Sequence, residues 1–164
     1  MLNYILWGVK VRSKVVMMQV NILLLSIRPE YAQKIINGTK TVELRRVRTR
    51  LKAGDLVLLY ISSPEKALVG SFEVEQVIEF ENSPKALKEF WNEVKNKAGI
   101  EQHKFYRYYQ GASVGVGIYI KKLEIFPRRL ELERLRKQLP SLKPPQNYRY
   151  LKEDELEAVK NLTR

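Results

Sequence analysis

The chain has 164 residues, enough for one domain with a hydrophobic core, and 45% of them are hydrophobic. Its 30 Lys and Arg residues outweigh 18 acidic ones, and the net charge of +12 favours an anionic partner, with nucleic acid first and a membrane surface second. The absence of cysteine excludes disulfides and thiolate metal sites and fits a cytoplasmic protein. No apolar run is long enough for a transmembrane helix. Of the two anionic partners we expect nucleic acid and no membrane.

The first eighteen residues mix apolar and basic side chains without a clear period. We expect residues 1–18 to be an N-terminal appendage, with Met17 or Met18 as an alternative start; an arm that packs on the domain is the other possibility. The run of apolar residues from Asn21 to Ile27 predicts the first strand of a domain over residues 19–127.

A short helix is predicted after this strand. Pro29 suits the first helical turn, Glu30 complements its positive end, and Gly38 suits the left-handed residue that ends a helix. These signals predict a helix over residues 29–37. Its first turn, beside Arg28, would offer backbone N–H groups to an anion.

The next strand brings opposite charges together. Its residues alternate, so Glu43 and Arg45 share one face, about 7 Å apart at roughly 3.3 Å per residue, and Lys40 stands at the strand entrance. Arg binds phosphate or carboxylate through two parallel hydrogen bonds, and Lys adds a point charge. The pattern indicates a site for an anionic or strongly polar ligand. The alternative is a structural ion pair in which Glu43 only balances two cations.

The later elements follow from turn residues and periodicity. Arg46 and Arg48 lie on a basic connection that would either track phosphates or form a solvated loop. Gly70 predicts a bend or bulge, the apolar phase slips after Ile120, and Pro127 is expected to end the sheet. The expected elements are strands at 55–62, 67–80 and 112–126 and helices at 84–97, 102–110, 130–139 and 152–162, with residues 128–164 as a helical C-terminal extension that packs on the barrel.

Two further segments are candidates for the ligand site. Tyr60, Ser62 and Ser63 end a strand expected to neighbour the charged one, where small residues let a ligand approach; an ordinary polar turn is the alternative. Gln146 and Tyr148 lie in a proline-rich segment that would fold back as a lid with groups suited to reading and stacking bases, or would serve as a linker.

The spacing of Gly38, Lys40, Glu43 and Arg45, after a helix that opens with Arg-Pro-Glu, resembles the signature of the ASCH domain family, in its small archaeal type. Later turns and strands resemble the family over roughly residues 20–126. The resemblance implies an α+β fold: a PUA-like β-barrel of five to six mostly antiparallel strands, closed or nearly closed, with flanking helices and a helical C-terminal tail.

The resemblance is compatible with two functions. PUA-like domains are thought to bind RNA beside the first helix, which implies an RNA-binding module for RNA or a nucleotide-like anionic ligand around Lys40, Glu43 and Arg45. The alternative is a small metal-independent hydrolase, because one ASCH branch comprises acetylcytidine amidohydrolases that use Lys, Thr and Glu, and some relatives are reported as ribonucleases.

The sequence matches that hydrolase branch only in part, and Glu93 is the nearest candidate for the branch's Glu. Lys40 matches the branch's Lys, but Glu43 stands at the Thr position, which argues against the same amidohydrolase chemistry. We favour the binding module. In an enzyme, Lys40 and Glu43 would be the acid–base pair, and no metal or cofactor is expected because the chain has one His and no Cys. Nothing in the sequence points to an oligomeric state.

Overall fold

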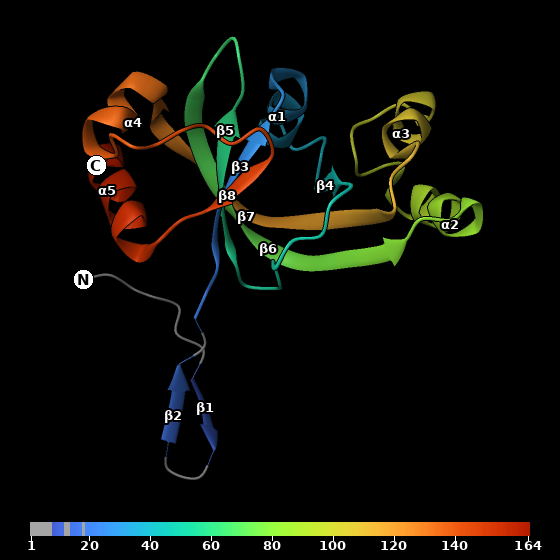
Figure 1. Ribbon diagram of the computed structural model, residues 1–164, viewed down its shortest axis with the longest axis horizontal. Helices are drawn as coiled ribbons and strands as arrows, with labels where there is room; N and C mark the ends of the chain where they lie inside the picture. Colours follow the sequence, from blue (N-terminus) through green and yellow to red (C-terminus); the bar gives the residue numbers. More distant parts are fainter. Residues whose placement is uncertain (1–7, 12–13, 18) are drawn as a thin grey trace.

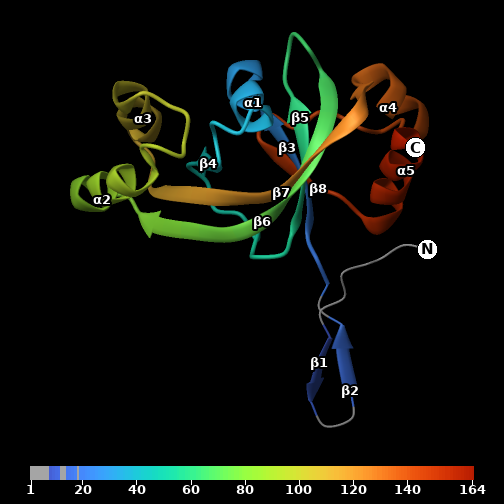
Figure 2. The same cartoon turned by 180° about the vertical axis from the view of Figure 1, so that it is seen from behind.

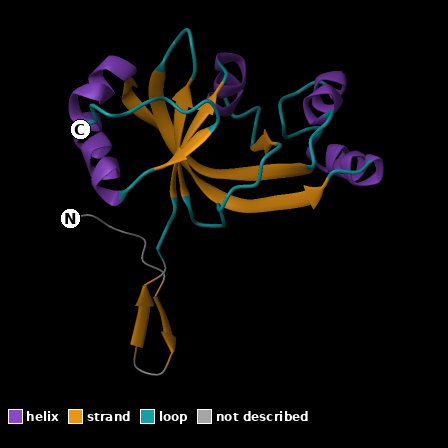
Figure 3. Cartoon of the chain, viewed as in Figure 1, coloured by secondary structure: helices purple, strands orange, loops and turns teal. Residues whose placement is uncertain are grey.

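A six-stranded sheet curls into a half-barrel with helices around it (Figures 1 and 3). The computed structural model describes residues 8–11, 14–17 and 19–164. The strands of the sheet are β3 (Ile22–Ile27), β4 (Val42–Arg45), β5 (Leu56–Ile61), β6 (Ala67–Glu81), β7 (Val114–Glu131) and β8 (Tyr148–Tyr150). The helices are α1 (Pro29–Ile36), α2 (Pro84–Val94), α3 (Gln102–Tyr109), α4 (Leu132–Gln138) and α5 (Glu153–Thr163).

The strand order is β4–β7–β6–β5–β3–β8, and every pairing is antiparallel except that of β3 with β5. The α+β class, with six mostly antiparallel strands, flanking helices and a C-terminal helix, is therefore confirmed. The sheet is a half-barrel because β4 and β8 form its two edges. In the described part of the chain, no helix has the length and apolar character needed to cross a membrane.

A two-stranded ribbon of β1 (Gly8–Val11) and β2 (Lys14–Met17) forms a sheet of its own before β3. Residues 1–7, 12, 13 and 18 lie outside the described residues. The appendage over residues 1–18 and the alternative start therefore stay predictions, as do the domain boundaries.

Alternation along the strands divides the apolar side chains among three clusters. The inner face of the sheet packs on α1, the outer face of β3 and β5 is covered by α4 and α5, and the outer face of β4 and β7 is covered by α2 and α3. Figures 1 and 2 show these two helix pairs at opposite ends of the sheet. On β3, Leu23 and Leu25 face inward while Ile22 and Leu24 face outward, so the strand is buried on both faces.

Two bulges bend the long strands where the sequence predicts them. Lys122 has φ +50°, and between the pairs Ser71–Glu124 and Glu73–Lys121 β7 carries one residue more than β6. Gly70 lies where the β5–β6 register shifts, and a Cβ there would collide with the carbonyl oxygen of Glu124. Both the bend at Gly70 and the phase slip after Ile120 are thus confirmed.

Two expectations about the C-terminal third are wrong. Pro127 does not end the sheet, because β7 continues to Glu131; its ladder to β6 is interrupted between Ile125 and Leu130, so the missing N–H of Pro127 costs no ladder bond. Residues 148–150, expected in a loop, form β8, which pairs antiparallel with β3.

Candidate functional site

A pocket of about 550 Å³ lies between α1, β4, α3 and the segment before β8. Basic side chains dominate its charge. The cations of its lining are Arg28, Lys40, Arg45, Lys104 and Arg107, against the carboxylates of Glu30 and Glu43. Its aromatic walls are Tyr31 and Tyr108, and its other lining residues are Ser26, Ile27, Leu44, Ile100, Gln146 and Asn147.

Glu43 and Arg45 reach this pocket from the inner face of β4. The predicted alternation is confirmed, because Val42 and Leu44 pack outward against α2 and α3. Nε of Arg45 lies 3.7 Å from Oε1 of Glu43, and Nη2 of Arg45 donates to the carbonyl oxygen of Ser26 at 2.9 Å. The second contact joins the edge strand β4 to β3 across the mouth of the half-barrel.

One oxygen of Glu43 is buried and has no hydrogen-bond partner. The residue is only 6% exposed, and its Oε1 accepts a hydrogen bond from the backbone N–H of Leu44 at 3.1 Å. Oε2 has no partner among the described residues. Leaving a buried acceptor unsatisfied costs about 1–3 kcal/mol, and more for a charged group, so a ligand that donates a hydrogen bond here would recover this free energy.

Lys40 lines the same pocket, and a backbone carbonyl group holds its ammonium group in place. It is 3% exposed, its Nζ donates to the carbonyl oxygen of Ala98 at 2.7 Å, and it lies 5.4 Å from the centre of the Tyr31 ring. Burial lowers the pKa of Lys40, and Glu43 opposes that shift. Gly99 permits the close passage, because it has φ +62° and a Cβ there would lie 3.1 Å from Cβ of Lys40.

Helix α3 supplies pocket residues that the sequence analysis missed. Phe105 and Tyr109 are fully buried against α2 and the sheet, as expected for core aromatics. The opposite side of the helix presents Lys104, Arg107 and Tyr108 to the pocket. The spacing of Phe105 and Tyr109, one helical turn apart, was the signal that could have assigned the two faces.

Arg28, Lys40, Glu43, Arg45 and Gln146 are the residues proposed from the sequence that line this pocket. With the lining residues of segment 100–108, the structure brings together side chains from residues 26–31, 40–45, 100–108 and 146–147. Whether they act on a ligand remains a prediction.

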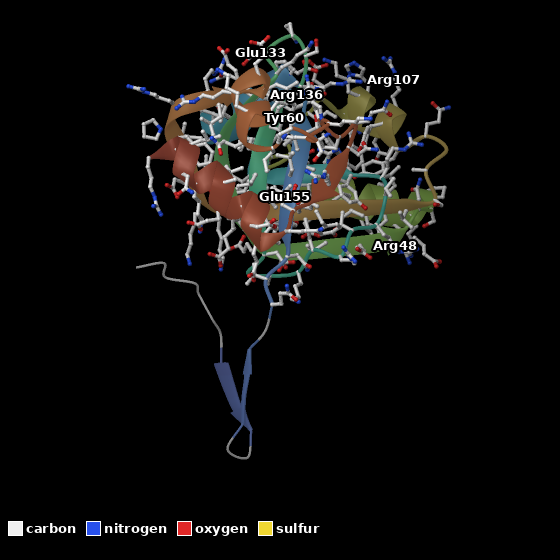
Figure 4. All side chains as sticks on the ribbon, turned by 60° about the vertical axis from the view of Figure 1, so that its left-hand side comes forward. Arg48, Tyr60, Arg107, Glu133, Arg136 and Glu155 are labelled. Carbon is white, nitrogen blue, oxygen red and sulfur yellow. The ribbon has the colours of Figure 1, made fainter. Side chains whose placement is uncertain are left out.

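The other proposed residues lie elsewhere. Tyr60, Ser62 and Ser63 are not among the residues that line the pocket, and the expectation that their strand neighbours the charged one is wrong, because β7 and β6 lie between β4 and β5. Tyr60 lies on the outer face of β5, where it packs under α4. It is near Arg136 and apart from Arg107 (Figure 4). Three more proposed residues, Arg46, Arg48 and Tyr148, also lie outside the pocket lining.

The described residues contain no group of three or more His, Asp or Glu side chains arranged to hold a metal ion. The sole histidine, His103, has an exposed side chain 3.4 Å from a carboxylate oxygen of Glu101. It therefore lies on the surface.

Tyr109 couples α3 to the strand that carries the charged pair. Its hydroxyl donates to the carbonyl oxygen of Arg45 at 3.1 Å and lies 3.4 Å from that of Val116. Burial raises the pKa of Tyr109 above its ordinary value of 10.0. The unfolded chain therefore releases this proton first, so the contribution to stability is complete below about pH 10 and is lost as the pH rises further.

We expect Tyr109→Phe to lose about 1 kcal/mol of unfolding free energy at neutral pH, because one buried hydrogen bond is removed. Between about pH 9 and 11 its stability should decline less than that of the unmodified protein. Urea denaturation across this range measures both effects, with Tyr106→Phe as the control on the same helix. Parallel declines in all three proteins would contradict the assignment.

Comparisons with known proteins agree on one family of relatives. A model of the ASCH domain family matches residues 25–131. The chain is 22% identical over 139 residues to an ASCH domain-containing ribonuclease of Zymomonas mobilis subsp. mobilis, an alignment that covers 85% of this chain and 90% of the relative.

Solved structures show the same fold. The crystal structure of ASCH from Zymomonas mobilis superposes with a TM-score of 0.77 at 21% identity, covering 86% of this chain and 94% of that one. Human THYN1 protein, in complex with 5-methylcytosine containing DNA, superposes with a TM-score of 0.58 at 12% identity, covering 88% and 98%. At these identities the likeness establishes the fold alone.

Proposed function

Because the chain belongs to the ASCH domain family, we propose that it binds single-stranded RNA in the pocket between α1, β4 and α3. The observation that carries this proposal is the charge of the pocket. Its lining holds five cations against two carboxylates around a volume of about 550 Å³, which is in the range of small-ligand sites. A relative named as a ribonuclease supports RNA as the ligand.

The remaining features of the pocket fit a nucleotide of a single strand. Tyr31 and Tyr108 offer half-buried ring faces, and stacking a base on an aromatic ring contributes about 1–3 kcal/mol. Arg28, Lys104 and Arg107 are exposed at the rim, where they would meet phosphates. The unpartnered oxygen of Glu43 would accept a hydrogen bond from a base amino group or a 2′-hydroxyl.

The test removes two rim cations of α3. We expect Lys104→Gln with Arg107→Gln to bind single-stranded RNA about 10-fold more weakly at low salt. The slope of log K against log salt should fall in magnitude by about 1.4, because each phosphate contact on a single strand contributes about 0.7. Fluorescence anisotropy over a salt series measures both, and DNA of the same sequence is the competing ligand.

A matched control is available on α2. Lys85→Gln with Lys88→Gln removes the same charge from exposed positions outside the pocket lining, and should change the slope little. Equal losses in the two double variants would mean that the protein only attracts polyanions through its net charge.

A second function, RNA cleavage, is favoured by one arrangement: Glu43, with a free carboxylate oxygen, and Lys40 are both buried and line the same pocket. In such a reaction Glu43 would take the proton of a 2′-hydroxyl, and the 2′-oxygen would attack the adjacent phosphorus. The bond from phosphorus to the 5′-oxygen would break, and Lys40 would protonate that oxygen. The products are a 2′,3′-cyclic phosphate and a 5′-hydroxyl, and Arg45 would stabilise the transient negative charge.

A further inference from the structure

An exposed basic segment runs from the end of β4 toward β5. Arg46, Arg48, Arg50 and Lys52 are all exposed there, and we call residues 46–52 the basic connection. Its one ion pair among the described residues joins Arg48 to Glu79 at 3.6 Å, with both side chains accessible to solvent, so it contributes little stability. The remaining charges of the connection are available to an anionic partner.

The basic connection has a fixed backbone although it is not a helix or a strand. The hydroxyl of Tyr148 donates to the carbonyl oxygen of Arg48 at 2.9 Å, and the backbone N–H of Arg50 donates to the hydroxyl of Tyr150 at 2.7 Å. Leu51 is buried in the inner core, which anchors the far end. Since the segment is already ordered, binding a partner to it costs less conformational entropy than binding to a free loop.

Two contacts make the basic connection continuous with the pocket. Nη1 of Arg46 donates to the carbonyl oxygen of Tyr108 at 2.9 Å, and Tyr108 is a wall of the pocket. On the other side, Asn147 lines the pocket and is followed directly by Tyr148, which holds Arg48. An RNA strand that leaves the pocket would therefore meet the cations of the basic connection directly, with no uncharged surface in between.

The basic connection also offers a flat surface for stacking. The guanidinium of Arg50 lies 4.2 Å from the centre of the Tyr150 ring, close enough for a cation–π contact. A guanidinium held against an aromatic ring leaves its other face open, and unpaired bases stack on such planes. Phosphate contacts and stacking together are what single-stranded nucleic acids use on binding surfaces.

From this arrangement we propose that the basic connection is a second RNA subsite, which binds the nucleotides that adjoin the one in the pocket. This proposal rests on the proposed function, because the strand is taken to be the same RNA. It predicts that affinity grows with RNA length, and that the growth depends on Arg48 and Arg50.

The test compares an RNA of about 12 nucleotides, within the length that single-strand sites usually cover, with a nucleoside monophosphate. For Arg48→Gln with Arg50→Gln we expect about 10-fold weaker binding of the long RNA at low salt, a slope smaller in magnitude by about 1.4, and unchanged monophosphate binding. Arg48→Lys with Arg50→Lys should keep the slope. Circular dichroism melting verifies that the variants fold.

The matched control is Arg128→Gln with Arg134→Gln, which removes the same charge from exposed positions at the end of β7 and on α4. Figure 4 shows Arg48 on the side of the molecule away from Glu133 of α4. Unchanged binding of the long RNA in the Arg48 and Arg50 variant, or a loss equal to that of the control, would overturn the second subsite. If the Arg48 and Arg50 variant loses affinity for the long RNA while the Lys104 and Arg107 variant binds it normally, the pocket proposal is overturned and the basic connection remains as the RNA site.

Discussion

Glu43→Gln is expected to slow the proposed RNA cleavage at least about 100-fold. The variant should still bind RNA, with an affinity about 10-fold lower at most, because the amide group that replaces Oε2 cannot accept a hydrogen bond from the ligand. Gln has almost the shape of Glu and its carbonyl oxygen still accepts the hydrogen bond from Leu44, but it cannot take up a proton. Mass spectrometry of a short RNA measures the rate and identifies the cyclic phosphate. Anisotropy with the same RNA measures the affinity.

The pocket supplies its own control for this change. Glu30→Gln makes the same substitution at an exposed position of the pocket lining, and should cleave at the unmodified rate. Lys40→Ala should stop turnover as well. Cleavage that survives in both Glu43→Gln and Lys40→Ala would place the chemistry elsewhere, whereas a protein that binds RNA and never cleaves it would reject the second function and leave the first.

The second large effect concerns the bend of the sheet. Gly70→Ala is expected to lose about 2–4 kcal/mol of unfolding free energy, because its Cβ would collide with the backbone carbonyl oxygen of Glu124, which no rotamer change can move. Urea denaturation followed by circular dichroism measures the loss.

Gly111→Ala separates this collision from the general cost of replacing a glycine. Gly111 has φ +75°, and a Cβ added there would have no atom within 4 Å, so the strain of a left-handed residue is its main cost, about 1–2 kcal/mol. A loss at position 70 no greater than that at Gly111 would mean that β6 and β7 separate easily at the bulge.

Local signals were sufficient for the elements that begin the site. Pro29 and Gly38 predicted the start and the end of α1 closely, and alternation predicted that Glu43 and Arg45 share one face of β4. These features depend on neighbours in the sequence, so a single sequence contains them. The bulges of β6 and β7 were also visible, as a glycine and as a slip in apolar phase.

What sequence reasoning missed depends on contacts between distant segments. The pocket forms only where α3 and residues 146–147 lie near β4, and no local sequence pattern predicts that these segments come together. Tyr60 was misplaced because β5 is apolar on both faces, so alternation could not tell the inner side from the outer one. β8 has three residues, too few for a periodic signal.

The pairing of β8 with β3 also affects where this chain can be cut. The family match stops at residue 131, but β3 lies between β5 and β8, and its six residues from Ile22 to Ile27 are all buried. A fragment without the last segment of the chain would turn this apolar strand into an open edge, with unpaired N–H and C=O groups ready to recruit a strand from another molecule. The C-terminal segment thus protects this edge of the sheet from aggregation. Recombinant fragments should therefore include it.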